Sequence, residues 1–435
     1  MLRPNVGFKL FRGRPTDKYG MVRPPVVTKS DQLKVIAQYY DQKVDHFDKQ
    51  NNKTFKQLYY VDDSHHKTGG PVFLMIGGEG AIDTSYVNGM FMGEMAKKYG
   101  ALAVAIEHRY YGNSIPTKDL TLENLKYLSS ELALKDTEQL ALYLIKKLSL
   151  QGNKWVVFGG SYAGNLAAWF REKYPNIAVG AIASSAPVEA AVDNMGYLGV
   201  VGESLGKECA DNIRKAHIDM ENLLKTPEAE EMMWSIAVDV QYNMGIADIV
   251  KTMNNPSGGT PLERYARLHG VGSHTVGCSD VKYEDLIGPL KKTSIDPQGM
   301  RQWTYQTCTE FGYYQTSDLP NSIFGHNIPV EFYIQQCADI YGPQFTAQSI
   351  QKAVDRTNAY YGGLKPNVTN VVFPNGSLDP WHALSVLKDL NNSTKAVMIE
   401  GYSHCGDMYG SRTTDKQSLK DAHKLIDQQI TNYLK

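Results

Sequence analysis

Short, uninterrupted runs of apolar residues recur along the chain and predict buried strands. They occupy residues 71–76, 101–106, 154–158, 179–183, 370–373 and 395–399. Strands of a parallel sheet have this composition because helices cover both faces of the sheet. Between the runs, residues 130–148 and 164–174 repeat their apolar positions with a helical period, and Pro175 ends the second stretch. The alternation predicts an open, mostly parallel α/β sheet.

The pattern changes in the first thirty residues and again in the middle of the chain. Residues 1–30 contain four prolines and little periodicity, which predicts an extended arm. Residues 196–350 are more polar and mostly helical in period, and we interpret them as an inserted cap over the carboxyl edge of the sheet, where ligands of open α/β folds bind. This division leaves residues 31–195 and 351–435 as the two parts of one core. The alternative is a separate helical domain without a role in the site.

Charge and composition exclude several classes of partner. The 435 residues carry 45 Lys and Arg against 46 Asp and Glu, a formal net charge of -1 without a basic stripe, so we expect no nucleic-acid partner. No apolar run approaches the ~20 residues that cross a bilayer, so we expect no membrane span. Neither H-E-x-x-H nor C-x-x-C occurs, and we therefore expect no metal.

The sharpest chemical signal is the segment FGGSYAG, residues 158–164, between a predicted strand and a predicted helix. A nucleophilic serine on a strand-to-helix turn needs small neighbours because the turn is strained and the backbones approach closely. Gly159 and Ala163 stand two residues before and after Ser161, although alanine departs from the usual G-x-S-x-G. We expect Ser161 to be the nucleophile of a serine hydrolase with an α/β-hydrolase core. The alternative is an ordinary serine in a glycine-rich turn.

The partners of such a serine follow it as an acid and then a histidine, each in a loop after a later strand. Asp379 lies in PNGSLDPW after residues 370–373, and His404 lies in GYSHCGD after residues 395–399. His404 would take the proton of Ser161 and pass it to the leaving group, while Asp379 would fix the tautomer and stabilise the imidazolium. Other histidines fit less well: His382 follows Asp379 too closely, and His108 precedes the serine in the chain.

Acyl transfer also needs two donors for the oxyanion. One is expected to be the backbone amide of Tyr162, directly after the nucleophile, and the other an amide of Gly78 or Glu79 in the segment IGGEG. GGEG can equally be a plain tight turn. It lacks the lysine of a phosphate-binding loop and the third glycine of a dinucleotide site, and we expect no cofactor.

Aromatic residues near these loops are candidates for a substrate pocket. Trp381 follows Asp379 by two residues, Tyr162 adjoins Ser161, and Trp303 and Tyr305 lie in the predicted cap. A pocket for an apolar substrate group needs apolar walls and few polar groups. Each of these residues could instead belong to the ordinary core.

Several segments together resemble a family of proline-specific serine peptidases, which includes lysosomal Pro-X carboxypeptidase, dipeptidyl peptidase II and thymus-specific serine protease. They are QKVDHF (42–47), GGEG (77–80), EHRYYG (107–112), GGSYAGNLAAWFREKYP (159–175), SSAPV (184–188), YQTCTEFGYY (305–314), NGSLDPWH (375–382) and SHCGDM (403–408). They run nearly end to end, and YQTCTEFG, TNAYYGG (357–363) and SHC are most similar to the thymus-specific member. The family's nucleophile, acid and base fall on Ser161, Asp379 and His404.

The resemblance implies a secreted, lysosomal or endosomal exopeptidase that cleaves peptides beside proline. Whether the chain forms a homodimer is left undecided by the sequence. It also implies a Cys308–Cys337 disulfide in the cap. Cys209 and Cys278 match family cysteines whose partners are missing here, and the cap is short between about 225 and 280, as if truncated. Cys405 is expected to be a free thiol. Sequons at Asn52, Asn367 and Asn391 fit a glycoprotein, although no apolar signal segment opens the sequence.

Two other functions remain compatible with these residues. The serine turn alone fits an esterase or lipase as well as a peptidase, and a non-catalytic binding protein could share the fold. The sequence also leaves open whether cleavage starts from the amino or the carboxyl end of the substrate.

Overall fold

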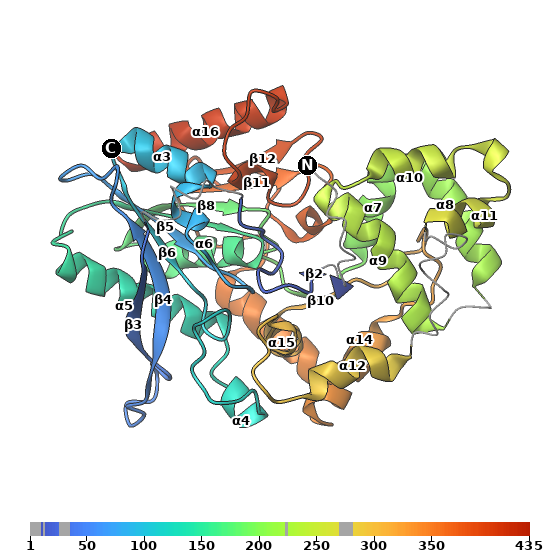
Figure 1. Cartoon of the computed structure of the whole chain (residues 1–435), viewed down its shortest axis with the longest axis horizontal. Helices are drawn as coiled ribbons and strands as arrows, with labels where there is room; N and C mark the ends of the chain where they lie inside the picture. The colour runs from blue at the N-terminus through green and yellow to red at the C-terminus, as the bar shows by residue number, and fades with distance from the viewer. Residues whose placement is uncertain (1–9, 12–13, 26–34, 222–224, 269–281) are drawn as a thin grey trace.

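The computed structural model describes residues 10–11, 14–25, 35–221, 225–268 and 282–435. Its centre is an eight-stranded sheet in the order β12-β11-β8-β7-β5-β6-β4-β3, and the six strands from β12 to β6 are parallel (Figure 1). The strands are β3 (Ala37–Lys43), β4 (Thr54–Asp62), β5 (Val72–Ile76), β6 (Leu102–Ile106), β7 (Trp155–Gly160), β8 (Ala178–Ser184), β11 (Val371–Gly376) and β12 (Thr394–Ile399). The six predicted strands are confirmed, and this sheet is that of an α/β-hydrolase core.

The two antiparallel strands at one edge are absent from the predicted elements. β3 pairs with β4, and β4 pairs with β6, both antiparallel. β3 has the sequence AQYYDQK, and most of its side chains are exposed or half-buried. An edge strand with this many polar residues lacks the continuous apolar run that marks the central strands.

Helices cover both faces of the sheet. α5 (Ser130–Lys147) and α6 (Tyr162–Lys173) pack with the side chains of β5 that point to one face, Val72, Leu74 and Ile76. α3 (Phe91–Tyr99) and α16 (Gln417–Tyr433) pack with Phe73 and Met75, which point to the other face. Successive side chains of a strand alternate between faces, so a buried strand such as β5 is apolar at every position.

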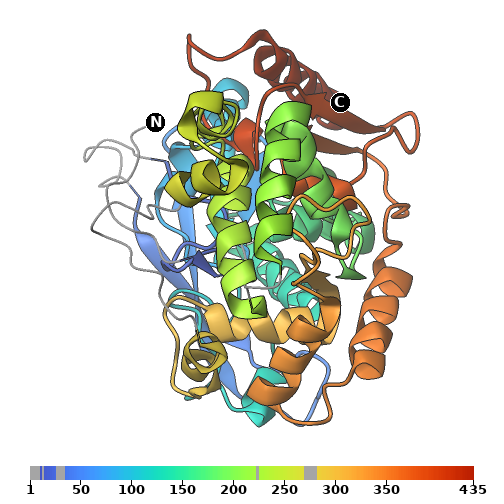
Figure 2. The ribbon, with the colours of Figure 1, turned by 90° about the vertical axis from the view of Figure 1, so that its right-hand side faces the viewer.

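The segment between β9 (Ala191–Asp193) and β11 is mostly helical. Its helices are α7 (Met195–Leu205), α8 (Lys207–Met220), α9 (Thr226–Tyr242), α10 (Ile246–Met253), α11 (Pro261–Leu268), α12 (Tyr283–Lys291), α13 (Met300–Gln306), α14 (Val330–Tyr341) and α15 (Ala347–Tyr361). In Figure 1 its helices α7 to α11 lie on the right, beside the core, and α12, α14 and α15 lie at the lower centre. Figure 2 shows the segment from the side that is on the right in Figure 1. We call this segment the insertion. No helix in the described ranges is long and apolar enough to span a bilayer.

Two details of the insertion differ from the expectation. A short strand, β10 (Gly312–Tyr314), pairs in parallel with β9 inside the stretch predicted to be helical. α15 runs through position 350, where the cap was expected to end. The ring of Tyr361, the last residue of α15, stacks on Trp169 of α6 at 3.8 Å between centroids, so this helix joins the insertion to the core.

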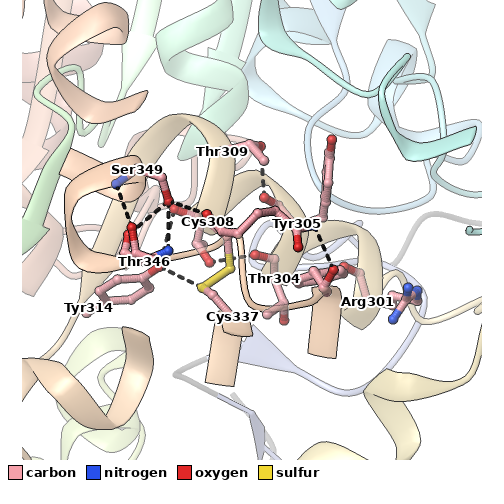
Figure 3. Close-up of a disulfide and its surroundings, with 12 residues drawn as sticks. Arg301, Thr304, Tyr305, Cys308, Thr309, Tyr314, Cys337, Thr346 and Ser349 are labelled. Carbon is pink, nitrogen blue, oxygen red and sulfur yellow. Dashed lines mark hydrogen bonds between the residues drawn. A yellow bond between two sulfur atoms is a disulfide. The ribbon is translucent and has the colours of Figure 1, made fainter. Parts of the chain in front are cut away.

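A disulfide between Cys308 and Cys337 links two parts of the insertion (Figure 3). Cys308 lies in η2 (Thr307–Phe311), a π-helical turn that continues α13, and Cys337 lies in α14. The hydroxyl of Tyr314 lies 3.1 Å from Cys337 Sγ. Cys209 and Cys405 are buried free thiols, and burial raises the pKa of each. Cys278 lies outside the described residues.

The described part of the N-terminal arm is packed into the molecule. β1 (Leu10–Phe11) and β2 (Arg14–Pro15) pair antiparallel, and the chain then continues to residue 25. Figure 1 shows β2, in dark blue, between the sheet and the helices of the insertion. Arg14 and Met21 are buried, with 0% and 3% of their surface exposed, so this stretch is not a free extended tail.

Three of the predicted glycosylation sites are open to solvent. Asn52, Asn367 and Asn391 are all exposed. Asn375, which also begins a sequon, is 1% exposed within β11 and is inaccessible to a glycan.

Candidate active site

Ser161 stands at the sharp turn between β7 and α6. Its backbone has φ 59° and ψ −135°, a conformation that L-residues rarely adopt and that marks strained functional turns. The turn depends on small neighbours, because a Cβ placed on Gly159 would lie 2.0 Å from the carbonyl oxygen of Ala163. Ala163 itself packs against Gly78, where an added Cβ would lie 3.3 Å from Ala163 Cβ. The glycine in the facing loop thus explains why alanine fits in place of the usual glycine.

Asp379 and His404 come together behind this turn from two neighbouring loops. Asp379 precedes η3 (Pro380–Leu384) after β11, and His404 lies after β12. His404 Nδ1 is 3.0 Å from each carboxylate oxygen of Asp379, and both side chains are 0% exposed. The amide of Trp381 donates to Asp379 Oδ1 at 3.0 Å and fixes the carboxylate. Burial opposes protonation of His404, but the Asp379 carboxylate outweighs it and raises the His404 pKa well above its ordinary value.

The serine and the histidine are not joined by a hydrogen bond in this form of the molecule. Ser161 Oγ donates instead to Met21 Sδ of the N-terminal arm at 3.6 Å. His404 Nε2, the nitrogen that would accept the serine proton, is buried without a hydrogen-bond partner among the described residues. The pair of His404 and Asp379 is therefore formed, while Ser161 faces the N-terminal arm.

The loop that carries His404 is held by the carboxyl end of β8 and by the insertion. Ser185 Oγ accepts the amide of Cys405 at 2.9 Å, and Ser184 Oγ donates to the carboxylate of Asp407. The amide of His404 donates to the carbonyl of Gln241 in α9 at 3.0 Å. Sequence reasoning did not assign roles to these residues. Only the SSAPV segment gave a signal for Ser184 and Ser185.

The loop after β5 holds the predicted oxyanion donors. Gly78 lies beside the start of α6, since a Cβ placed on it would lie 3.3 Å from the amide nitrogen of Ala163. Glu79 is 3% exposed. Its Oε1 accepts the amide of Met21 at 2.8 Å, and its carbonyl accepts Nη2 of Arg14 at 2.5 Å. In this form the loop therefore binds the arm.

The side chain of Tyr162 points away from its own amide into a buried hydrogen-bond network. Its hydroxyl lies 3.0 Å from His108 Nε2 and accepts Nε2 of Gln306 in α13 at 3.1 Å. Burial lowers the pKa of His108 to about 4 and raises the pKa of Tyr162 well above its ordinary value, so both rings are neutral. His108 thus belongs to this buried network, which links Tyr162, the residue after Ser161, to the insertion.

The predicted pocket aromatics separate into two groups. Trp381 is buried beside His404, with 6.4 Å between ring centroids, and its indole nitrogen donates to Gln241 Oε1 at 3.2 Å. Trp303 lies 5.7 Å from the ring of Tyr162. Tyr305 contacts Tyr341 and Phe345 instead. Figure 3 shows Tyr305 on the same side of α13 as the disulfide. Residues two apart on a helix point in different directions, so Trp303 and Tyr305 contact different aromatic neighbours.

Comparison with known proteins agrees with the resemblance inferred from the sequence segments. The model of the family "Serine carboxypeptidase S28" matches residues 42–251 and 239–426. Thymus-specific serine protease of Mus musculus is 34% identical, over 91% of this chain and 87% of its own. The Homo sapiens protein of the same name is 33% identical, over 91% and 86%. Lysosomal Pro-X carboxypeptidase of Bos taurus is 30% identical, over 89% and 86%. The chain is therefore a serine peptidase that belongs to the serine carboxypeptidase S28 family.

Proposed function

We propose that this chain is an exopeptidase that cleaves peptides beside proline, with Ser161 as nucleophile, His404 as base and Asp379 as the residue that orients the base. The observation that carries the proposal is the buried pair in which His404 Nδ1 lies 3.0 Å from both oxygens of Asp379. A carboxylate in this position holds the Nδ1–H tautomer and leaves Nε2 free to accept a proton. The strained turn at Ser161 supports its choice as the nucleophile.

The reaction follows from these roles. Ser161 Oγ attacks the scissile carbonyl carbon while His404 Nε2 takes the hydroxyl proton, and the oxyanion forms beside the amides of Tyr162 and of Gly78 or Glu79. The C–N bond then breaks as the imidazolium returns the proton to the leaving amine. Water, activated by the same imidazole, hydrolyses the acyl-enzyme and regenerates Ser161.

Preference for proline rests on the aromatic surroundings and on the names of the relatives. The indole ring of Trp381 lies 6.4 Å from the ring of His404, between centroids. A rigid pyrrolidine ring without an amide proton is recognised by such a surface rather than by hydrogen bonds. The name of one relative, lysosomal Pro-X carboxypeptidase, gives a proline-containing substrate and a lysosomal location for that protein. We propose that this chain is likewise lysosomal or secreted.

The nucleophile is tested by Ser161→Ala. We expect kcat to fall by about 10⁴-fold or more, because the members of a triad act as a unit, with an unchanged circular-dichroism spectrum. A fluorophosphonate probe should label the wild type at Ser161 and leave the variant unlabelled. Retention of about a tenth of wild-type kcat would reject the assignment.

The substrate class is tested by a panel of proline-containing peptides beside a p-nitrophenyl ester. Masses of the products show whether residues leave from the amino or the carboxyl end. Efficient turnover of the ester, with no cleavage of any peptide, would favour the esterase alternative.

A further inference from the structure

One part of the N-terminal arm, the segment Arg14–Arg23, lies directly on the residues proposed for catalysis. From here on, 'the arm' means this segment. Met21 is 3% exposed, and its Sδ is the atom that Ser161 Oγ contacts, at 3.6 Å. A small cavity remains beside the serine turn. Its walls include Tyr19 and Val22 of the arm, together with Gly78 and Gly160 of the core. The arm thus forms one side of the space next to the nucleophile.

The arm is bound by main-chain hydrogen bonds, as a peptide ligand would be. The amide of Met21 donates to Glu79 Oε1 at 2.8 Å, and the carbonyl of Lys18 accepts the amide of Ala81 at 2.7 Å. The hydroxyls of Tyr86 and Tyr409 donate to the carbonyls of Val22 and Arg23, at 3.0 and 3.1 Å. Each of these four partners belongs to the core, so the arm crosses the active-site loops from one side to the other.

The contact with the nucleophile is unproductive. Ser161 faces a thioether sulfur, which has no carbonyl carbon to attack, so the arm can occupy the site without being cleaved. A substrate carbonyl must come within about 3–3.5 Å of the serine oxygen before it can react. Met21 fills that space.

We infer, on the basis of the function proposed above, that the arm is an intramolecular inhibitor that occupies the peptide site of this enzyme and must leave before substrate binds. The observed fold is the self-inhibited state. Substrate competes with the arm, and kcat/KM is reduced by the fraction of molecules in which the arm is docked.

The arm also has features that favour release. Arg14 is fully buried, and its guanidinium contacts the Glu79 carbonyl and Met300 Sδ, while its Nε has no hydrogen-bond partner among the described residues. A buried cation without a complete set of acceptors lowers the stability of the docked state.

The test uses Gly20, where the arm touches the loop after β5. Gly20 has φ +71°, and a Cβ on it would lie 2.9 Å from the Glu79 carbonyl oxygen, so Gly20→Ala disfavours docking by strain and by contact. The control is Gly69→Ala, which has the same strain at φ +77° but no atom within 4 Å of the added Cβ. We expect Gly20→Ala to increase both the rate of fluorophosphonate labelling at Ser161 and kcat/KM about tenfold. This factor corresponds to the free-energy cost of placing an L-residue in the left-handed backbone conformation. Gly69→Ala should match the wild type.

Hydrogen exchange supplies a readout that is independent of catalysis. The amides of Met21 and Ala81 should lose protection in Gly20→Ala, and a synthetic peptide of residues 14–23 should slow labelling of that variant again. Gly80→Ala is a second release variant, because its Cβ would lie 2.3 Å from the backbone of Tyr19.

Three other outcomes would each reject the inference that the arm inhibits the enzyme, and each can be told from the others. Loss of protection without faster labelling would mean that the docked arm does not block Ser161. Full protection in both variants would mean that the arm is a permanent part of the fold. Loss of protection with no labelling of any variant would reject Ser161 as the nucleophile, and the inhibition would be rejected with it.

Discussion

Asp407 lies three residues after His404, and its raised pKa should make the free energy of unfolding depend on pH. Its carboxylate is 3% exposed and accepts the hydroxyl of Ser184. Burial raises the pKa of Asp407 from 3.8 to about 7, against the opposing effect of the Ser184 hydrogen bond. The native protein therefore holds a proton that the unfolded chain releases.

The sign and size of the effect follow by linkage. Between about pH 4 and pH 7 the unfolded chain binds fewer protons than the native protein, so stability falls as the pH rises, and the loss is complete above pH 7. The full rise in pKa corresponds to about 4 kcal/mol at most. Asp407→Asn keeps an oxygen that can accept the Ser184 hydroxyl and cannot ionise. Its stability relative to the wild type should therefore grow by about 1.4 kcal/mol per pH unit within this window.

The assay is urea unfolding followed by tryptophan fluorescence, at several values from pH 4.5 to 8. Burial also raises the pKa of Glu107 to about 7, but this group is present in both proteins and cancels in the difference. Asp421→Asn, at an exposed position of α16, controls for the loss of one negative charge. A stability difference between Asp407→Asn and the wild type that is constant across this range would refute the reasoning.

Two further predictions concern the pocket and the disulfide. Trp381→Ala should reduce kcat/KM for a proline peptide far more than for a small activated ester, whose acyl group leaves the pocket empty, and equal losses would assign Trp381 only to support of the Asp379 loop. Replacing Cys308 and Cys337 together with serine opens a link between residues 29 apart and should cost about 3–4 kcal/mol on the chain-entropy model. The melting temperature measures this loss of stability, with Cys209→Ala, at a buried free thiol, as the control. Comparable melting temperatures of the two variants would contradict the prediction.

Local patterns in the sequence were enough to predict the central sheet and the serine turn. Continuous apolar runs identify the six parallel strands, and burial on both faces explains this composition for β5, β6 and β7, which are buried at every position. Strand-to-loop order then selects Asp379 and His404, since the carboxyl ends of parallel strands share one edge of the sheet. The antiparallel strands β3 and β4 carry polar side chains on an exposed face, so the same criterion does not detect them.

Long-range contacts could not be predicted in this way. Nothing in the composition of residues 14–23 indicates that Met21 lies on Ser161, because that contact joins positions 140 residues apart and depends on the shape of the whole core. Tyr305 shows the same limit at shorter range. It belongs to a segment near the site, but the direction in which its side chain points is set by the turn of α13 on which it lies.

The insertion supplies hydrogen-bond partners to the proposed catalytic loops. Gln241 of α9 accepts the amide of His404 through its carbonyl, and its side-chain oxygen accepts the indole of Trp381. Gln306 of α13 donates to the hydroxyl of Tyr162, next to Ser161. His404 and Tyr162 are thus each held by a different helix of the insertion, while Asp379 is held within its own loop. Because hydrogen-bond partners fix the positions of reacting groups, a displacement of either helix would alter the geometry of catalysis as well as the choice of substrate. Relatives that share the core but differ in the insertion should therefore differ in kcat and not only in KM.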